Sequence, residues 1–167
     1  MEIRDRATFL DYHSSFHGRT RRVIMCIPPD DFEWAPAPGK FSFGDIVRHL
    51  AGIERYMYGE TVQGNPSRYS GHGPDLADGF DETLAYYDRL HDESKEIFGS
   101  LDDATLAGKC LTPAGTPITT WKWLRAMFEH EAHHRGQIYM MLALRGVKTP
   151  PLYGLTEEEV VARSIRA

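Results

Sequence analysis

The sequence predicts an all-α protein in which one domain, spanning residues 1–167, forms a four-helix bundle. Apolar residues recur three and four positions apart in four long segments, as in amphipathic helices. Stretches rich in proline and glycine separate these segments and predict the connections between helices. A chain of 167 residues, 41% of them hydrophobic and 26% charged, is long enough for one domain with a hydrophobic core.

Composition narrows the classes of partner. A net charge of -5 and the lack of a basic cluster argue against a nucleic-acid-binding protein. No segment has the roughly 20 apolar residues of a membrane span, and the N-terminal residues do not resemble a signal peptide. Two cysteines, Cys26 and Cys110, do not make a disulfide framework and predict free thiols in a reducing compartment. We therefore expect a cytoplasmic protein.

The first helix is predicted over residues 5–27, followed by a proline-rich connector over residues 32–40. Pro28-Pro29 ends the helix because proline lacks an amide donor and disfavours the α conformation in the residue before it. Apolar residues at roughly helical spacing mark the face of this helix that we expect to be buried: Tyr12, Phe16, Val23 and Ile27.

The second helix has a well-marked start. Ser42 is the expected N-cap and Asp45 the N3 residue of a capping box, while Phe41 and Ile46 occupy the positions of a hydrophobic staple. His49 lies three residues after Ile46 and therefore shares its inward face. Ile53 and Met57 continue the predicted apolar stripe, and residues 59–64 close the helix.

The rest of the chain is predicted to hold two long helices and one short helix. In chain order we expect a loop over residues 65–79 and a helix over residues 80–101. An irregular segment over residues 102–118 is expected to hold a small hairpin around Pro113-Ala114-Gly115. A long helix then runs from Thr119 or Thr120 to near Gly146, and a short C-terminal helix begins at Thr156, with Glu159 completing a capping box.

The strongest chemical signal is a pair of histidines, His130 and His134, in the last long helix. Residues four apart project from one helix face, so both imidazoles can reach a single metal ion. A lone histidine on an apolar face is most often a core residue with a hydrogen bond, but two neutral rings in one small volume both need partners. A third protein ligand is required, and His49 is the best candidate because it faces inward from another helix.

Other readings of the histidine pattern are weaker. His13 and His17 are also four apart, but their segment is more charged, and a solvated or partly buried pair is favoured over a ligand role. His133 points to one side of the helix. The sequence from His130 to His134 also matches the zincin protease motif, with Glu131 as general base. A zincin requires a substrate-binding sheet before this helix, where helices are predicted.

These residues carry a resemblance to the DinB/YfiT-like superfamily of metal-binding four-helix bundles. Phe41-Ser42-Phe43-Gly44-Asp45-Ile46-Val47-Arg48-His49-Leu50 resembles the start of that family's second helix, with Phe41 where tryptophan is common. His130-Glu131-Ala132-His133-His134-Arg135-Gly136-Gln137-Ile138 resembles its fourth-helix signature, and Pro150-Pro151-Leu152-Tyr153-Gly154 a familiar ending. The resemblance spans nearly the whole chain and implies an up-down-down-up bundle.

The resemblance also implies a function. It implies a divalent metal, zinc or nickel, held by His49, His130 and His134, and a homodimer. Characterised members of the family include transferases that use a low-molecular-weight thiol, either bacillithiol or mycothiol, and a maleylpyruvate isomerase that uses mycothiol. A three-histidine metal can lower the pKa of a bound thiol, which favours a thiol-dependent S-transferase acting on small electrophiles. Three alternatives stay open: a metal-dependent hydrolase, a metal-binding stress-response protein without catalysis, and a vestigial site in a bundle that only dimerises.

Two further residues are candidates to support the site. Gln137 faces the histidines and is expected to orient water or substrate. Asp45 precedes His49 by one helical turn and is expected either to accept the free ring N–H of His49 or to serve only as part of the helix cap.

Overall fold

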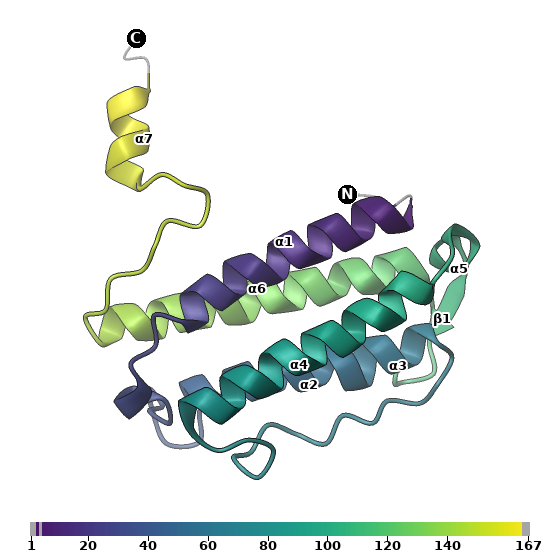
Figure 1. The fold of residues 1–167 in the computed structure, drawn as a ribbon, viewed down its shortest axis with the longest axis horizontal. Coiled ribbons are helices and arrows are strands. Elements are labelled where there is room, and N and C mark those ends of the chain that lie inside the picture. Colours follow the sequence, from purple (N-terminus) through teal and green to yellow (C-terminus); the bar gives the residue numbers. More distant parts are fainter. Residues whose placement is uncertain (1–2, 4, 165–167) are drawn as a thin grey trace.

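Four long helices pack side by side into a bundle in the computed structural model, which describes residue 3 and residues 5–164 (Figure 1). They are α1 (Arg6–Ile24), α2 (Phe43–Ile53), α4 (Gly79–Ser100) and α6 (Thr120–Leu144). Helices α1 and α2 each pack against both α4 and α6, so α1 and α2 lie diagonally across the bundle. Helices α1 and α6 run in one direction and α2 and α4 in the other, which confirms the up-down-down-up bundle.

Shorter elements connect the long helices. A 3₁₀ turn, η1 (Pro29–Asp31), follows α1, and α5 (Asp103–Ala107) follows α4. The predicted hairpin is present as β1 (Lys109–Leu111) and β2 (Pro117–Thr119), which pair antiparallel with Cys110 opposite Ile118. Helix α5 falls in a segment that was predicted to be irregular. It is one short turn capped by the side chain of Asp102, too short to show a periodic pattern.

The helix starts follow the capping residues. Ser42 and Asp45 form the predicted capping box of α2, with both of its hydrogen bonds present. Thr156 and Glu159 do the same for α7 (Glu157–Arg163). The first helix is shorter than predicted, since Asp5 is its N-cap and it ends at Ile24, three residues before the expected end.

The second helix was predicted to continue regularly to about residue 59, but its α-helical part ends at Ile53. It changes into a π-helical turn, η2 (Glu54–Tyr58), and then into α3 (Gly59–Val62). The last two residues of the predicted stripe, Ile53 and Met57, are half-buried and pack against the core, whereas Glu54 and Tyr58, which were not predicted, are buried. A π-turn holds more residues than an α-turn, so a helical period counted from Ile46 does not predict the buried face beyond it.

The burial of α1 also differs from the prediction. His13 is fully buried and His17 is 8% exposed, so the pair is neither solvated nor half-exposed. Both lie on the same face as Phe9, Phe16 and Val23, which are spaced seven residues apart. Tyr12 is half-buried and lies beside this face. Because the prediction took Tyr12 as a core residue, it placed the buried face one residue away from His13.

The hydrophobic core has two clusters, one toward each end of the bundle. The first joins α1, α2, α4 and α6 around Ile24, Phe43, Val47, Leu90 and Ile138, and the second gathers aromatic and aliphatic residues around Phe9, Phe98, Leu106, Leu124 and Phe128. Helix α7 contributes no buried residue and stands away from the bundle (Figure 1). Among residues 3 and 5–164, no helix is both long enough and apolar enough to cross a membrane.

Candidate metal centre

Three histidine side chains converge between α2 and α6. Nε2 of His130 lies 3.1 Å from Nε2 of His49 and 3.1 Å from Nε2 of His134. His130 and His134 come from successive turns of α6, and His49 reaches them from the capped, buried part of α2. The structure therefore brings together the three residues that the sequence singled out, with one ring nitrogen of each within 4.8 Å of the other two.

Neighbouring side chains fix how two of the rings are oriented. His134 Nδ1–H donates to Gln137 Oε1 at 2.7 Å, which leaves the lone pair of His134 Nε2 directed at the cluster. His49 Nδ1 lies 2.6 Å from the hydroxyl oxygen of Tyr69, and a ligand role for His49 Nε2 requires Nδ1–H to donate to that oxygen. Histidines that bind metal commonly have such a partner on the other ring nitrogen.

The three rings are electrically neutral near pH 7. Burial, together with the like charges of the neighbouring histidines, lowers the pKa of His49 to about 3. The same causes, burial first, lower the pKa of His130 to about 4, and burial lowers the pKa of His134. Neutral imidazoles offer lone pairs, which is the form in which histidine binds metal ions.

A metal ion fits this donor set. Ligand atoms at about 2.05 Å from a tetrahedral zinc ion are roughly 3.3 Å apart, close to the 3.1 Å separations of the ring nitrogens. Without a cation, the three neutral Nε2 atoms would face one another with few N–H groups available to form hydrogen bonds between them. Three protein ligands are also the number that leaves a coordination position for another molecule.

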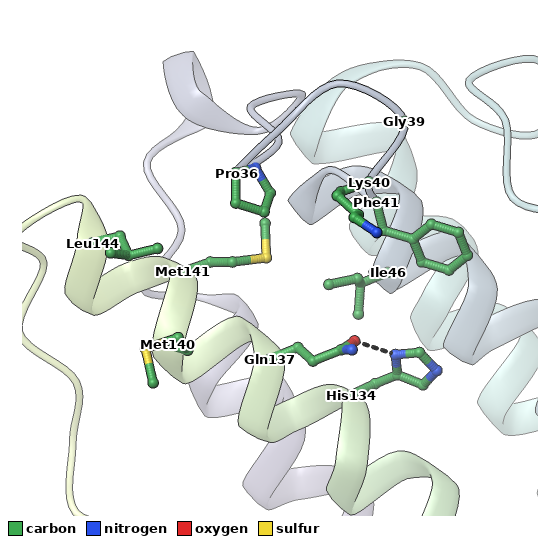
Figure 2. Close-up of a pocket in the computed structure, with 10 residues that line it drawn as sticks. All are labelled: Pro36, Gly39, Lys40, Phe41, Ile46, His134, Gln137, Met140, Met141 and Leu144. Atoms are coloured by element: carbon green, nitrogen blue, oxygen red, sulfur yellow. Dashed lines mark hydrogen bonds between the residues drawn. The ribbon is translucent and has the colours of Figure 1, made fainter.

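A cavity of about 510 Å³ opens beside His134 (Figure 2). The connector before α2 and the C-terminal half of α6 form its walls, which are mostly apolar and include Phe41, Ile46 and Met141. The polar groups that line it are those of Lys40, His134 and Gln137. A volume of this size suits a small organic molecule.

Comparisons with known proteins agree with this architecture. A family model described as the DinB superfamily matches residues 14–138, a span that includes His49, His130 and His134. The chain belongs to the DinB superfamily. A search of curated proteins found no match.

Two solved DinB-like structures share the fold. A DinB-like protein from Bacillus cereus superposes with a TM-score of 0.74 at 16% identity, covering 89% of this chain and 97% of its own. A DinB-like protein from Bacillus subtilis, YjoA, gives 0.69 at 18% identity, covering 88% of this chain and 97% of its own. At these identities the likeness shows the fold alone.

Asp45 does not support His49 in this DinB protein, contrary to one of the two predicted roles. Its carboxylate accepts the backbone N–H of Ser42 and lies 3.3 Å from both Arg48 and His72. Asp45 is thus occupied by the helix cap, Arg48 and His72, while the hydroxyl oxygen of Tyr69 lies beside His49 Nδ1. No sequence pattern indicated Tyr69, because it lies in a loop without periodicity.

Two other polar residues of α6, Glu131 and His133, do not point at the three-histidine cluster. Glu131 is buried and accepts a hydrogen bond from Thr20 on α1, away from the cavity, and burial raises its pKa to about 7. His133 is exposed, and its Nε2 meets Gln137 Nε2 at 3.2 Å. The protease reading would need Glu131 beside an open substrate cleft, and its carboxylate instead lies inside the bundle.

Proposed function

We propose that this DinB protein is a divalent-metal-dependent enzyme, namely a thiol-dependent S-transferase that acts on small electrophiles. The observation that carries the proposal is the convergence of three histidine Nε2 atoms beside an apolar cavity, with His134 belonging to both. A site for a metal alone would not require a neighbouring cavity suited to a small organic molecule.

His49, His130 and His134 would hold zinc or nickel, because imidazole nitrogen suits both ions. When bound, such a metal supplies Lewis acidity that lowers the pKa of a thiol and favours the nucleophilic thiolate. Gln137 keeps the ring of His134 in place through its hydrogen bond to Nδ1, and Tyr69 does the same for His49.

The cavity supports an apolar, weakly polar or anionic substrate. Phe41, Ile46 and Met141 offer surface that excludes water around an electrophilic carbon. Lys40 places an ammonium group at the wall, which suits a carboxylate on the substrate or an anionic leaving group. Phe41 also lies over the site, with its ring centroid 5.7 Å from that of His49 and 6.3 Å from that of His134.

The proposal includes a cellular setting and partners. A reducing cytoplasm supplies low-molecular-weight thiols, and the two cysteines of the chain, Cys26 and Cys110, are unpaired. The partners proposed are a small-molecule substrate and a second copy of the chain, with no nucleic acid and no membrane.

The test uses protein purified without a histidine tag and loaded with zinc or nickel. Electrophiles such as alkyl and aryl halides are incubated with cysteine, glutathione, bacillithiol or mycothiol, and consumption is followed by mass spectrometry. We expect formation of the thioether with at least one thiol, lost on chelation and in His49→Ala, and kept in the matched control His133→Ala.

Other outcomes identify the alternatives. Consumption of esters or amides without any thiol would point to a metal-dependent hydrolase. Tight metal binding with no turnover of any substrate would favour a non-catalytic metal-binding protein, and failure to bind any metal would favour a bundle with a vestigial site.

A further inference from the structure

A second group of metal-binding side chains lies inside the bundle, made by residues that the three-histidine site does not use. His13 of α1, Glu54 of η2 and His91 of α4 each offer one ligand atom, and these atoms lie within 4.8 Å of one another. All three residues are buried, with exposed fractions of 0%, 7% and 8%. They come from three separate elements, so the tertiary fold alone brings them together (Figure 1).

Both imidazoles approach the same carboxylate oxygen. His91 Nδ1 lies 3.1 Å from Glu54 Oε1, and His13 Nε2 lies 3.3 Å from the same atom. These separations are close to the roughly 3.3 Å between neighbouring ligands of a tetrahedral zinc ion. The ring centroids of His13 and His91 are 4.5 Å apart, so both rings border one small volume.

The hydrogen bonds of the structure do not account for the burial of the His13 ring nitrogens. His13 is fully buried, yet within the described part of the chain neither of its ring nitrogens makes a hydrogen bond, and the nearest acceptor of Nε2 is Glu54 Oε1 at 3.3 Å. A buried polar group without a partner costs about 1–3 kcal/mol, and such groups are rare in native structures. A cation between His13 Nε2 and Glu54 would give that nitrogen a partner.

The backbone at this point is also unusual. Glu54 is the first residue of a π-helical turn, in which the N–H of Gly59 bonds to the carbonyl of Glu54. Single π-turns inside α-helices occur often at functional sites. Here the turn begins at the one carboxylate of the cluster.

We propose that His13, Glu54 and His91 form a second site for a divalent transition metal, distinct from the three-histidine site. Two imidazoles and one carboxylate are a ligand set used for zinc and for iron(II), and cobalt(II) serves as a spectroscopic substitute for zinc. Of the three proposed ligands, His91 has the largest exposed fraction, 8%. This inference does not rest on the proposed transferase activity.

Metal stoichiometry tests the site directly. Untagged protein is saturated with Zn²⁺ or Co²⁺, freed of excess ion by gel filtration, and analysed for metal per chain. We expect two metals in the wild-type protein and one in His91→Gln, with one also remaining in the double variant His130→Ala/His134→Ala. The matched control is His17→Gln, which should keep two, because His17 stacks on His91 but is outside the ligand set.

Two further measurements keep the test independent of any one variant. Glu54→Gln should also bind one metal, and its fold is checked by circular dichroism. Anomalous diffraction from wild-type crystals grown with Co²⁺ should show a peak between His13, Glu54 and His91. The proposal is overturned if that peak is absent at saturating Co²⁺, if the His130→Ala/His134→Ala variant folds but binds no metal, or if His91→Gln still binds two.

Discussion

Tyr69 is the residue whose contribution to the three-histidine site is most readily isolated. Its hydroxyl oxygen lies 2.6 Å from His49 Nδ1, and removing it takes away the partner of that ring nitrogen without touching a ligand. Losing such a partner typically lowers metal affinity 10–100-fold. We therefore predict that Tyr69→Phe weakens zinc binding by about 10–100-fold, measured by competition with a chromogenic chelator.

The control for this variant is Tyr56→Phe, because the Tyr56 ring lies against the guanidinium groups of Arg55 and Arg68 and, within the described part of the chain, makes no ring contact or hydrogen bond with the three histidines. Its zinc affinity should equal that of the wild-type protein. Equal affinities in all three proteins would show that Tyr69 does not hold His49 in its binding orientation.

His17 provides a pH-dependent term in the stability of the metal-free protein. It is buried, its ring stacks on His91 at 3.4 Å and on Tyr87 at 4.6 Å, and its Nε2 is 3.8 Å from Asp88. Burial first, and then the charge of His91, lower the pKa of His17 to about 3, with Glu54 and Asp88 opposing. As the pH falls below 6.5, His17 therefore takes up a proton in the unfolded chain but stays neutral in the folded chain.

The stabilising contribution of a neutral His17 is thus complete above pH 6.5 and is lost as the pH falls toward 3. At pH 5.5 the loss is roughly 1 kcal/mol relative to pH 7. We predict that urea unfolding in EDTA shows a drop between these two pH values that is about 1 kcal/mol smaller in His17→Gln than in the wild-type protein. Equal drops would mean that His17 is protonated in the folded state near its ordinary pKa.

Helix α2 is tied to its surroundings by Arg48, whose side chain is completely buried. Its guanidinium makes two hydrogen bonds to Glu33, at 2.8 and 2.9 Å, and others to the carbonyls of His72 and Ala77. Gly44 permits this arrangement, since a Cβ there would lie 2.5 Å from Glu33 Oε1. One side chain thus fixes the connector and the long loop around the helix that carries His49.

We predict that Arg48→Met lowers the free energy of unfolding by about 3 kcal/mol, because the partly buried carbonyls of His72 and Ala77 lose their donor. The matched control is Arg89→Met, which breaks an exposed pair with Glu93 four residues away and should cost less than about 1 kcal/mol. Urea denaturation of both variants checks the prediction. A loss as small in Arg48→Met as in the control would mean that water replaces these contacts.

Local patterns predicted the elements of the bundle well, and long-range contacts were the part that they missed. The capping boxes at Ser42 and Thr156 involve residues three apart, so the sequence contains both partners. Tyr69 meets His49, and Glu54 meets His13, only after folding, and no spacing in the sequence relates them. His49 was found because its helical phase could be counted from Ile46, before the π-turn changes the register.

Exposed apolar side chains gather toward the C-terminal end of the chain. Met140 and Leu144 on α6 are 64% and 63% exposed, Tyr153 is 80% exposed, and Val160 and Val161 on α7 are about half exposed. Helix α7 stands apart from the bundle, as Figure 1 shows. Apolar surface of this kind commonly marks an interface, and symmetric dimers are the most frequent assembly.

We predict a homodimer, observed by light scattering as twice the chain mass of 19.0 kDa. Val160→Glu/Val161→Glu should shift the equilibrium to monomer, whereas Leu111→Glu, at a residue 55% exposed on the hairpin, should not. A wild-type monomer at micromolar concentration would contradict the dimer. A dimer unaffected by the double variant would place its interface elsewhere.

The two metal sites predict how the bundle as a whole responds to zinc. The first joins α2 to α6, and the second joins α1, η2 and α4, so bound ions would connect all four long helices. An ion that binds only the folded state, at about 100 times its Kd, adds about 2.7 kcal/mol, which for a chain of this length raises Tm by roughly 5–10 °C.

Because the sites share no ligand, the shifts in Tm should be nearly additive. We predict that His91→Gln and His130→Ala/His134→Ala each keep part of the zinc-induced shift, and that the two parts sum to the wild-type value. Calorimetry with and without zinc measures all three proteins. A full wild-type shift in His91→Gln, with none in the double variant, would assign all of the stabilisation to the three-histidine site.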